Sequence, residues 1–313
     1  MRRIIKIRAI PFQEPHEAAL GTATKASTLK IICLTSQLRT DFVTSQNKEA
    51  NTMTSTEAYR DYAEELEGRL RLKTFPVAVK LLEQESDIPQ GAIRPLEDFG
   101  YHLSLCQAFQ LSRREGQAIA MLKEDMWCFE PVVGYGLAEP PKYFLQGHNR
   151  YPSDVATLEA GSHYAHEFPR LEVGKYVGVV SAPLKTSNFE PDVVMIYADS
   201  AQLSLLLLGR EYKEGYNLKC ALSAHAACVY AVVPAVQSGE CQVAVPCRGD
   251  RYSAMAGDNE MIFTIPRQKL EDLMVGLRHL DSTGSRLPRG YRFQPEYPLS
   301  ESYKKIAQII GYL

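Results

Sequence analysis

The sequence predicts an α+β protein in which a mixed sheet carries flanking helices. From about residue 54 onward, short apolar runs of strand length alternate with segments of helical periodicity. Hydrophobic residues make up 45% of the 313 residues and charged residues 23%, which is typical of a globular protein. A weak internal repeat further suggests that the fold is built from two similar strand–helix–strand halves.

The first half of this pattern begins with a helix. Thr54 or Thr56 can cap it, and its apolar stripe runs to about Arg69. The elements that follow are a strand over 77–82, a helix over 103–117 stopped at Gly116, a strand over 118–122, a loop broken by Pro and Gly over 128–141, and a helix over 154–167.

The rest of the chain, in which the second half begins with the strand over 192–198, has the same mixture of strands and helices. Pro234 should end or kink the small-residue helix over 222–236, because proline removes a backbone donor. The predicted elements are strands over 176–183, 192–198, 241–246 and 261–265, a polar loop over 246–260, and helices over 200–210, 222–236, 267–280 and 299–311.

Residues 1–52 differ in composition from the rest of the chain. They carry eight Lys and Arg against four acidic residues, and all 17 tyrosines follow Asn51. Few aromatic residues are available there to build a core. We therefore predict a weakly ordered N-terminal extension over 1–52 and a single core domain over 53–313.

Charge and hydropathy bear on the partners and the compartment. The formal net charge of -2 provides no basic field to attract nucleic acid or anionic lipid, and no apolar run reaches the ~20 residues of a spanning helix. We expect neither a nucleic-acid nor a membrane partner. Seven cysteines, an odd number, without a signal peptide favour the reducing cytoplasm.

Four cysteines are the strongest chemical signal. Cys106, Cys128, Cys228 and Cys247 occupy corresponding places in the two proposed halves. Thiolates are the preferred ligands of zinc and of iron–sulfur clusters, so we take these four as candidate metal ligands. The chain has no Cys-x-x-Cys pair, so the fold itself would have to bring the sulfurs together. His225, three residues before Cys228, could share a helix face with it.

The polar segment 246–260 contains a second group of candidates. Arg248 and Arg251 can bind a carboxylate or phosphate, and Arg251 could lower the pKa of Cys247. A solvated loop with surface ion pairs would explain the same residues. Three functions are compatible with the sequence: a metal or iron–sulfur protein, a small-molecule protein that holds an anion through Arg251, and a cysteine-dependent enzyme that uses Cys247. No histidine partner for Cys247 can be assigned, and neither a reaction nor an oligomeric state follows.

Several motifs occur together in this order along the chain. They are LCQAFQLSRREG with Cys106, Trp127–Cys128 ahead of GYGL, PDVVMIYADSAQ, AACVYA with Cys228, and PCRGDR followed by DNEMIFTIP. In these motifs the chain, from about Tyr59 to Leu313, resembles an uncharacterised family called domain of unknown function 169, or ArCR. The most specific motif combines Cys247, Gly249 and Arg251 with Glu260, and we take Arg251 and Glu260 as candidate cofactor-binding residues. The resemblance implies no reaction.

Overall fold

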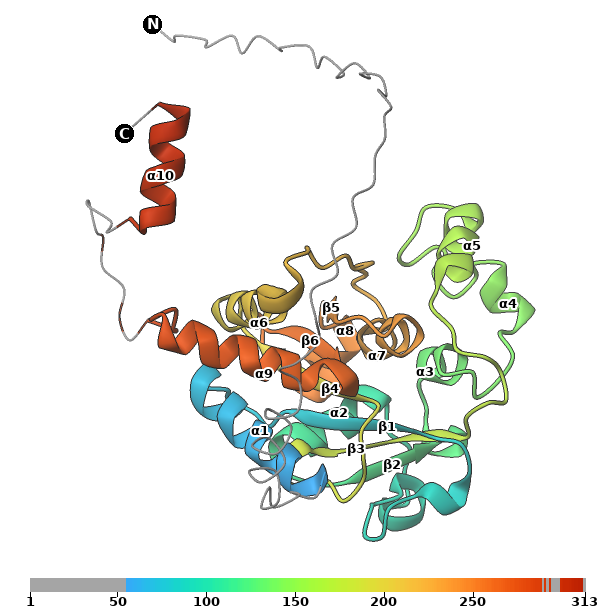
Figure 1. Cartoon of the computed structure of the whole chain (residues 1–313). Helices are drawn as coiled ribbons and strands as arrows, with labels where there is room; N and C mark the ends of the chain where they lie inside the picture. The colour runs from blue at the N-terminus through green and yellow to red at the C-terminus, as the bar shows by residue number, and fades with distance from the viewer. Residues whose placement is uncertain (1–54, 289, 291–292, 294–298, 312–313) are drawn as a thin grey trace, which may run out of the picture. The chain divides into compact units, whose positions relative to one another are not determined.

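The computed structural model describes residues 55–288, 290, 293 and 299–311 (Figure 1). The chain divides into two units, Met1–Thr52 and Met53–Leu313. The predicted N-terminal extension lies outside the described residues. Within the described ranges, no helix is long and apolar enough to cross a membrane. Strands and helices alternate, which confirms the predicted α+β class.

A six-stranded sheet with the order β2-β3-β1-β4-β6-β5 forms the centre of the second unit. The strands are β1 Val77–Leu82, β2 Ile119–Leu122, β3 Gly178–Pro183, β4 Val193–Ala198, β5 Gln242–Ala244 and β6 Met261–Pro266. All five pairs of neighbouring strands are antiparallel. Where a mixed sheet was expected, parallel pairing in the described chain is confined to two isolated bridges, Ile93 with Ile119 and Leu103 with Met126.

The strand order repeats between the two halves. In each half the first strand neighbours the third, and the second strand lies at the sheet edge. The two first strands, β1 and β4, pair antiparallel in the middle of the sheet, with Val77 opposite Met195 and Val79 opposite Val193. This arrangement is what a pseudo-twofold axis between β1 and β4 would produce. The halves differ in their other helices. The second half has α6 (Ser200–Glu214) where the first half has residues 83–104, and the first half has two further helices within 142–167.

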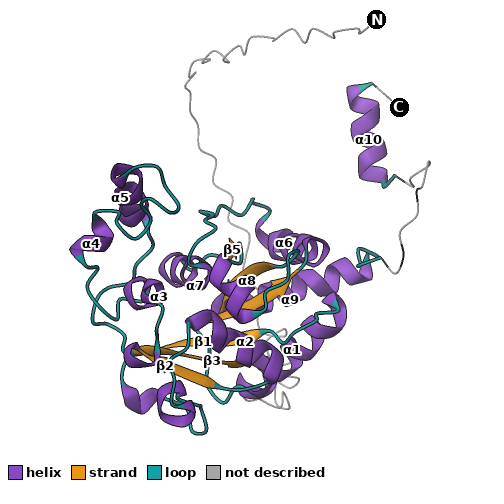
Figure 2. Ribbon diagram, turned by 180° about the vertical axis from the view of Figure 1, so that it is seen from behind, coloured by secondary structure: helices purple, strands orange, loops and turns teal. Residues whose placement is uncertain are grey.

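Helices cover both faces of the sheet (Figure 2). Val77 and Val79 of β1 face a core formed with α2 (Leu105–Glu115) and α7 (Ala227–Ser238). The intervening Ala78 faces a second core, formed with α1 (Ser55–Leu70), α6 and α9 (Arg267–Ser282). Because successive strand side chains point to opposite faces, both sets must be apolar, which explains the uninterrupted apolar runs in the sequence.

Helices α6 and α9 cross with direct backbone contact. Gly209 and Gly276 face each other at the crossing, and a Cβ built on Gly276 would overlap the Gly209 carbonyl oxygen. Leu277 lies against Gly209 in the same contact. The two glycines therefore set the distance between the helices.

Two segments predicted as loops contain short helices instead. They are α3 (Phe129–Gly134) and α8 (Arg248–Ala254), and Cys128 and Cys247 are their N-cap residues. Pro131 lies in the first turn of α3, where a missing N–H costs no helical hydrogen bond. Helix α7 continues past Pro234 by one turn and ends at Gly239 in the left-handed conformation.

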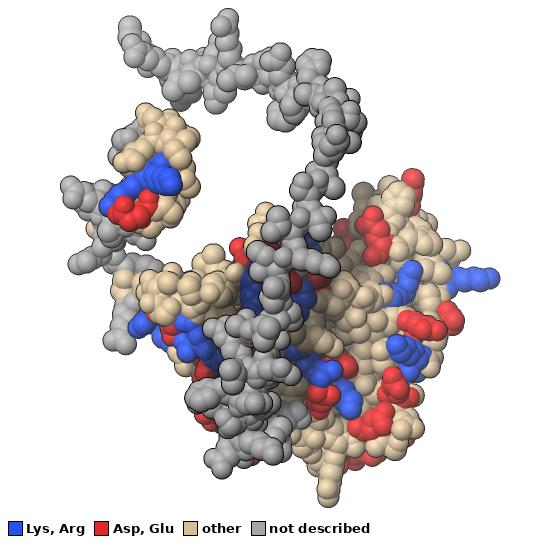
Figure 3. Space-filling view, in the orientation of Figure 1, with Lys and Arg blue, Asp and Glu red and all other residues tan. Residues whose placement is uncertain are grey.

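The remaining helices of the described residues are α4 (Lys142–Leu145), α5 (Leu158–Glu167) and α10 (Glu301–Ile310). The last two agree with the predicted helices over 154–167 and 299–311. Lys and Arg side chains are interspersed with Asp and Glu over the described surface visible in Figure 3.

Candidate functional site

A cavity of about 750 Å³ opens where the two halves meet. All four predicted cysteine ligands and Arg251 lie on its wall. Glu260 does not. The lining residues are Ser104, Cys106, Trp127, Cys128, Glu130, Arg150, Ser153, Asp154, Ala224, His225, Ala226, Cys228, Val245, Pro246, Cys247, Arg248, Gly249, Arg251 and Tyr252.

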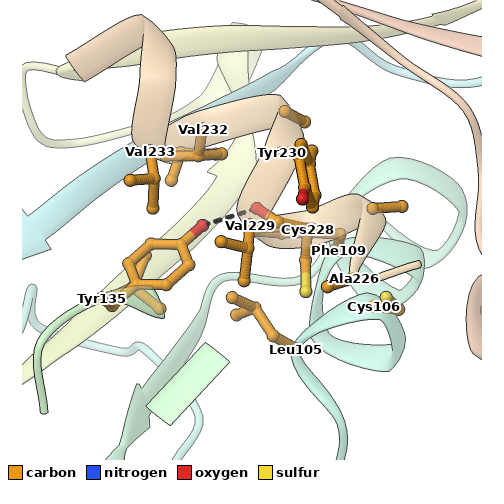
Figure 4. Close-up of a cluster of buried hydrophobic side chains, with 14 of the residues drawn as sticks. Leu105, Cys106, Phe109, Tyr135, Ala226, Cys228, Val229, Tyr230, Val232 and Val233 are labelled. Carbon is orange, nitrogen blue, oxygen red and sulfur yellow. Dashed lines mark hydrogen bonds between the residues drawn. The ribbon is translucent and has the colours of Figure 1, made fainter. Parts of the chain in front are cut away.

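The cysteines come to this cavity in two equivalent pairs. Cys106 and Cys228 are each the second residue of a helix, α2 and α7, that covers the same face of the sheet. Cys128 and Cys247 each follow the edge strand of their half and cap a short helix. Figure 4 shows the sulfurs of Cys106 and Cys228 at the neighbouring ends of α2 and α7, and the hydrogen bond from the Tyr135 hydroxyl to the Cys228 carbonyl.

Cys247 is held as a thiolate. Its sulfur accepts a hydrogen bond from the Asp250 N–H, and the Cys106 thiol and the backbone N–H groups of Ala227 and Gly249 also favour its negative charge. The Asp250 nitrogen lies 3.4 Å from the Cys247 Sγ. These donors stabilise the negative charge more than partial burial opposes it, and they lower the pKa of Cys247 to about 5. The cysteine is therefore ionised at neutral pH.

The other two buried thiols stay protonated. Interactions with Cys228 and Cys247, together with burial, raise the pKa of Cys106 well above its usual range. The interaction with Cys106 lowers the pKa of Cys228, but burial and the charge of Cys247 more than offset it. Cys106 is thus coupled to both other cysteines.

Cys128 lies on a separate part of the wall, built around a carboxylate. Its thiol donates to the Glu130 Oε2 at 2.8 Å, and burial together with the Glu130 charge raises the Cys128 pKa. The buried Arg150 guanidinium binds Glu130 at 3.3 Å and Asp154 at 3.2 Å. This clamp fixes the Glu130 carboxylate beside the Cys128 thiol.

Arg150 also orients a histidine. One of its Nη1 hydrogens points to the Nδ1 of His225 at 3.0 Å. A guanidinium cannot accept a hydrogen bond, so Nδ1 is the acceptor and the ring proton of the neutral form is on Nε2. Burial, and then the charge of Arg150, lower the pKa of His225, which favours this neutral form.

A buried polar network lies beside Cys247. The Tyr197 hydroxyl donates to Asp250 Oδ2 at 3.1 Å. Burial, and then the charge of Cys247, raise the pKa of Asp250 to about 7. The Arg113 guanidinium stacks on the Tyr197 ring, 3.8 Å from its centroid, and binds both Glu260 oxygens at 3.3 Å.

The two candidate cofactor-binding residues have structural partners. Glu260 accepts the Gly257 N–H at 2.7 Å in addition to Arg113. Arg251 donates to the Gly257 carbonyl at 2.7 Å, and its ion pair with the exposed Asp258 is 3.9 Å long. Both therefore hold the turn after α8, although Arg251 also lines the cavity. Arg248, at the start of α8, has no carboxylate within ion-pair distance among the described residues.

The cysteines do not form a ready metal site. Across the described ranges, no group of three or more His, Cys, Asp or Glu side chains is arranged to hold a metal ion. Zinc or an iron–sulfur cluster on Cys106, Cys128, Cys228 and Cys247 thus stays a prediction. The sequence did not predict Glu130, Arg150 and Asp154 as site residues, because nothing in their local sequence indicates that they lie near a cysteine.

Comparisons with known proteins cover most of this unit. Residues 65–276 match the model of a family described as uncharacterised ArCR, domain of unknown function 169, and the match includes all the cavity's cysteines. An uncharacterized protein of Methanocaldococcus jannaschii is 23% identical over 223 residues, which are 70% of this chain and 94% of that protein. No solved structure matches the chain.

Proposed function

The chain belongs to the uncharacterised ArCR family, and we propose that it performs thiol chemistry on a small anionic molecule, with Cys247 as the nucleophile. One observation carries the proposal. The Cys247 sulfur accepts the Asp250 N–H, and a thiol and two further backbone N–H groups favour its negative charge, while it lines a cavity of about 750 Å³. Burial alone would raise the pKa of this thiol, so these groups are what favour the thiolate.

The other side chains on the cavity wall fit this role. Arg248 supplies a cation for the anionic group of the ligand. The Nε2–H of neutral His225 can donate a hydrogen bond to the anionic group of the ligand. The cavity is large enough for a small organic molecule.

Alkylation with iodoacetamide tests the proposal without a known substrate. We expect Cys247 to be labelled first and its labelling rate to rise through about pH 5 and then level off, because the thiolate is the reactive form. An ordinary cysteine would reach half its maximal rate only at about pH 8.5. Peptide mapping by mass spectrometry over this pH range measures both quantities.

Two variants make this measurement specific. Cys247→Ser should remove the fast labelling at low pH. Cys220→Ser is the matched control, because Cys220 is partly exposed and does not line the cavity. The proposal is wrong if Cys247 titrates near the ordinary cysteine value, or if Cys220 accounts for the fast labelling.

A soft metal centre is the second candidate, favoured by the four cysteines that reach one cavity from four separate segments. The cavity exceeds what a single zinc ion fills, so an iron–sulfur cluster is the better occupant. We expect anaerobically purified protein to be brown and to contain iron and acid-labile sulfide, and the Cys247→Ser variant to lose both. Colourless wild-type protein without iron, zinc or sulfide would rule this candidate out.

A further inference from the structure

We propose that Cys106 is the resolving thiol of Cys247, and that the pocket takes small anionic disulfides as its substrate class. This inference rests on the proposed role of Cys247 as the nucleophile. It adds a second reacting residue and a defined product, an internal disulfide between α2 and α8.

The contacts among the sulfurs single out Cys106. Its helix α2 packs directly against α8, and it is the one thiol of the described chain that favours the Cys247 thiolate. Cys228 interacts with Cys247 only through its charge, and the Cys128 thiol donates to Glu130. Cys106 and Cys247 both line the cavity, so an adduct on Cys247 would form next to the second thiol.

The position of Cys106 in α2 also suits the reaction. Ser104 caps this eleven-residue helix, and Cys106 is its second residue. The positive end of the helix dipole stabilises negative charge as it develops on the Cys106 sulfur during attack. Both cysteines are free thiols in this structure, which is the reduced form of the pair.

The two steps balance. The Cys247 thiolate attacks a small disulfide, forms one sulfur–sulfur bond and releases the first half of the disulfide as a thiolate. Cys106 then attacks the Cys247 sulfur of the mixed disulfide. The Cys106–Cys247 bond forms, the second half leaves, and the proton of Cys106 leaves with it as a thiol. The small disulfide is the oxidant, and two thiols of the protein are oxidised.

Glutathione disulfide is a suitable probe because it is small, anionic and available. The reduced full-length protein is incubated with it anaerobically near neutral pH, quenched with acid and analysed by intact mass and peptide mapping. Wild-type protein should contain the Cys106–Cys247 disulfide and retain no glutathione. Cys106→Ser and Cys106→Ala should retain one glutathione on Cys247, with release of the second thiol slowed by about tenfold or more.

Cys241→Ser is the matched control, because Cys241 is also a buried free cysteine but does not line the cavity. It should behave like the wild type. The inference is overturned if wild-type protein keeps glutathione on Cys247, or if Cys241→Ser is the variant that accumulates it. If Cys247 carries no glutathione in the Cys106 variants, while circular dichroism shows them folded, the proposed function fails and this inference fails with it.

Discussion

Replacing Arg113 with Met should lower the free energy of unfolding by about 3–5 kcal/mol. The Arg113 side chain is fully buried, and its guanidinium binds Glu260, which is itself 7% exposed. It also donates to the Met255 carbonyl at 3.2 Å. The substitution would leave the buried Glu260 carboxylate without its cation, which costs far more than the loss of an exposed ion pair. Urea unfolding followed by circular dichroism measures the loss.

Arg114→Met is the control for this prediction. Arg114 is the next residue of α2, is exposed, and donates to the same Met255 carbonyl at 3.0 Å. We expect a change within about 0.5 kcal/mol, as for most surface substitutions. Equal losses of unfolding free energy in the two variants would show that the buried ion pair of Arg113 with Glu260 stabilises the fold no more than an exposed contact does.

Replacing Gly276 with Ala should be the second large effect, a loss of about 3 kcal/mol or more. Alanine is the better helix former by about 1 kcal/mol, so propensity alone predicts a gain. The new methyl group would overlap the Gly209 carbonyl oxygen, however, and backbone cannot rotate away as a flexible side chain can. The two helices must therefore move apart and lose packing along the crossing. The shift in thermal unfolding temperature measures the result.

Gly68→Ala supplies the opposite expectation from the same substitution. Gly68 lies within α1, and a Cβ built there has no atom within 4 Å. This variant should gain about 0.5–1 kcal/mol. Destabilisation of both variants to the same degree would mean that the contact between α6 and α9 is not what excludes alanine at Gly276.

Local sequence patterns were sufficient for most elements of the fold. The strand predicted over 77–82 is β1 to the residue, and Gly116 ends α2 as expected. The segments holding α3 and α8 were predicted as loops because they are short and rich in Pro, Gly and polar residues. Their helical turns begin at cysteines, which are uncommon N-caps, so the usual signal of Ser, Thr, Asp or Asn was missing.

The candidate site was predictable in part. The weak repeat placed the four cysteines at equivalent positions, and the sheet order explains why equivalent positions meet at one cavity. The clamp of Arg150 on Glu130 and His225 could not be predicted, because it joins residues up to 75 positions apart through tertiary packing alone. Glu260 was predicted to bind a cofactor because of its sequence motif. In the structure its partners are Arg113 and the turn after α8.

The joint between β1 and β4 has a mechanical consequence. Three residue pairs join these strands, whereas six join β1 to β3 and six join β4 to β6. We therefore expect the sheet to bend most easily between β1 and β4, with each half moving as a rigid unit. Cys106 and Cys128 belong to the first half, and Cys228 and Cys247 to the second. Bending there would change the separation of Cys106 and Cys247. The packing of α2 against α8 and the ion pair of Arg113 with Glu260 both join the two halves and oppose that motion.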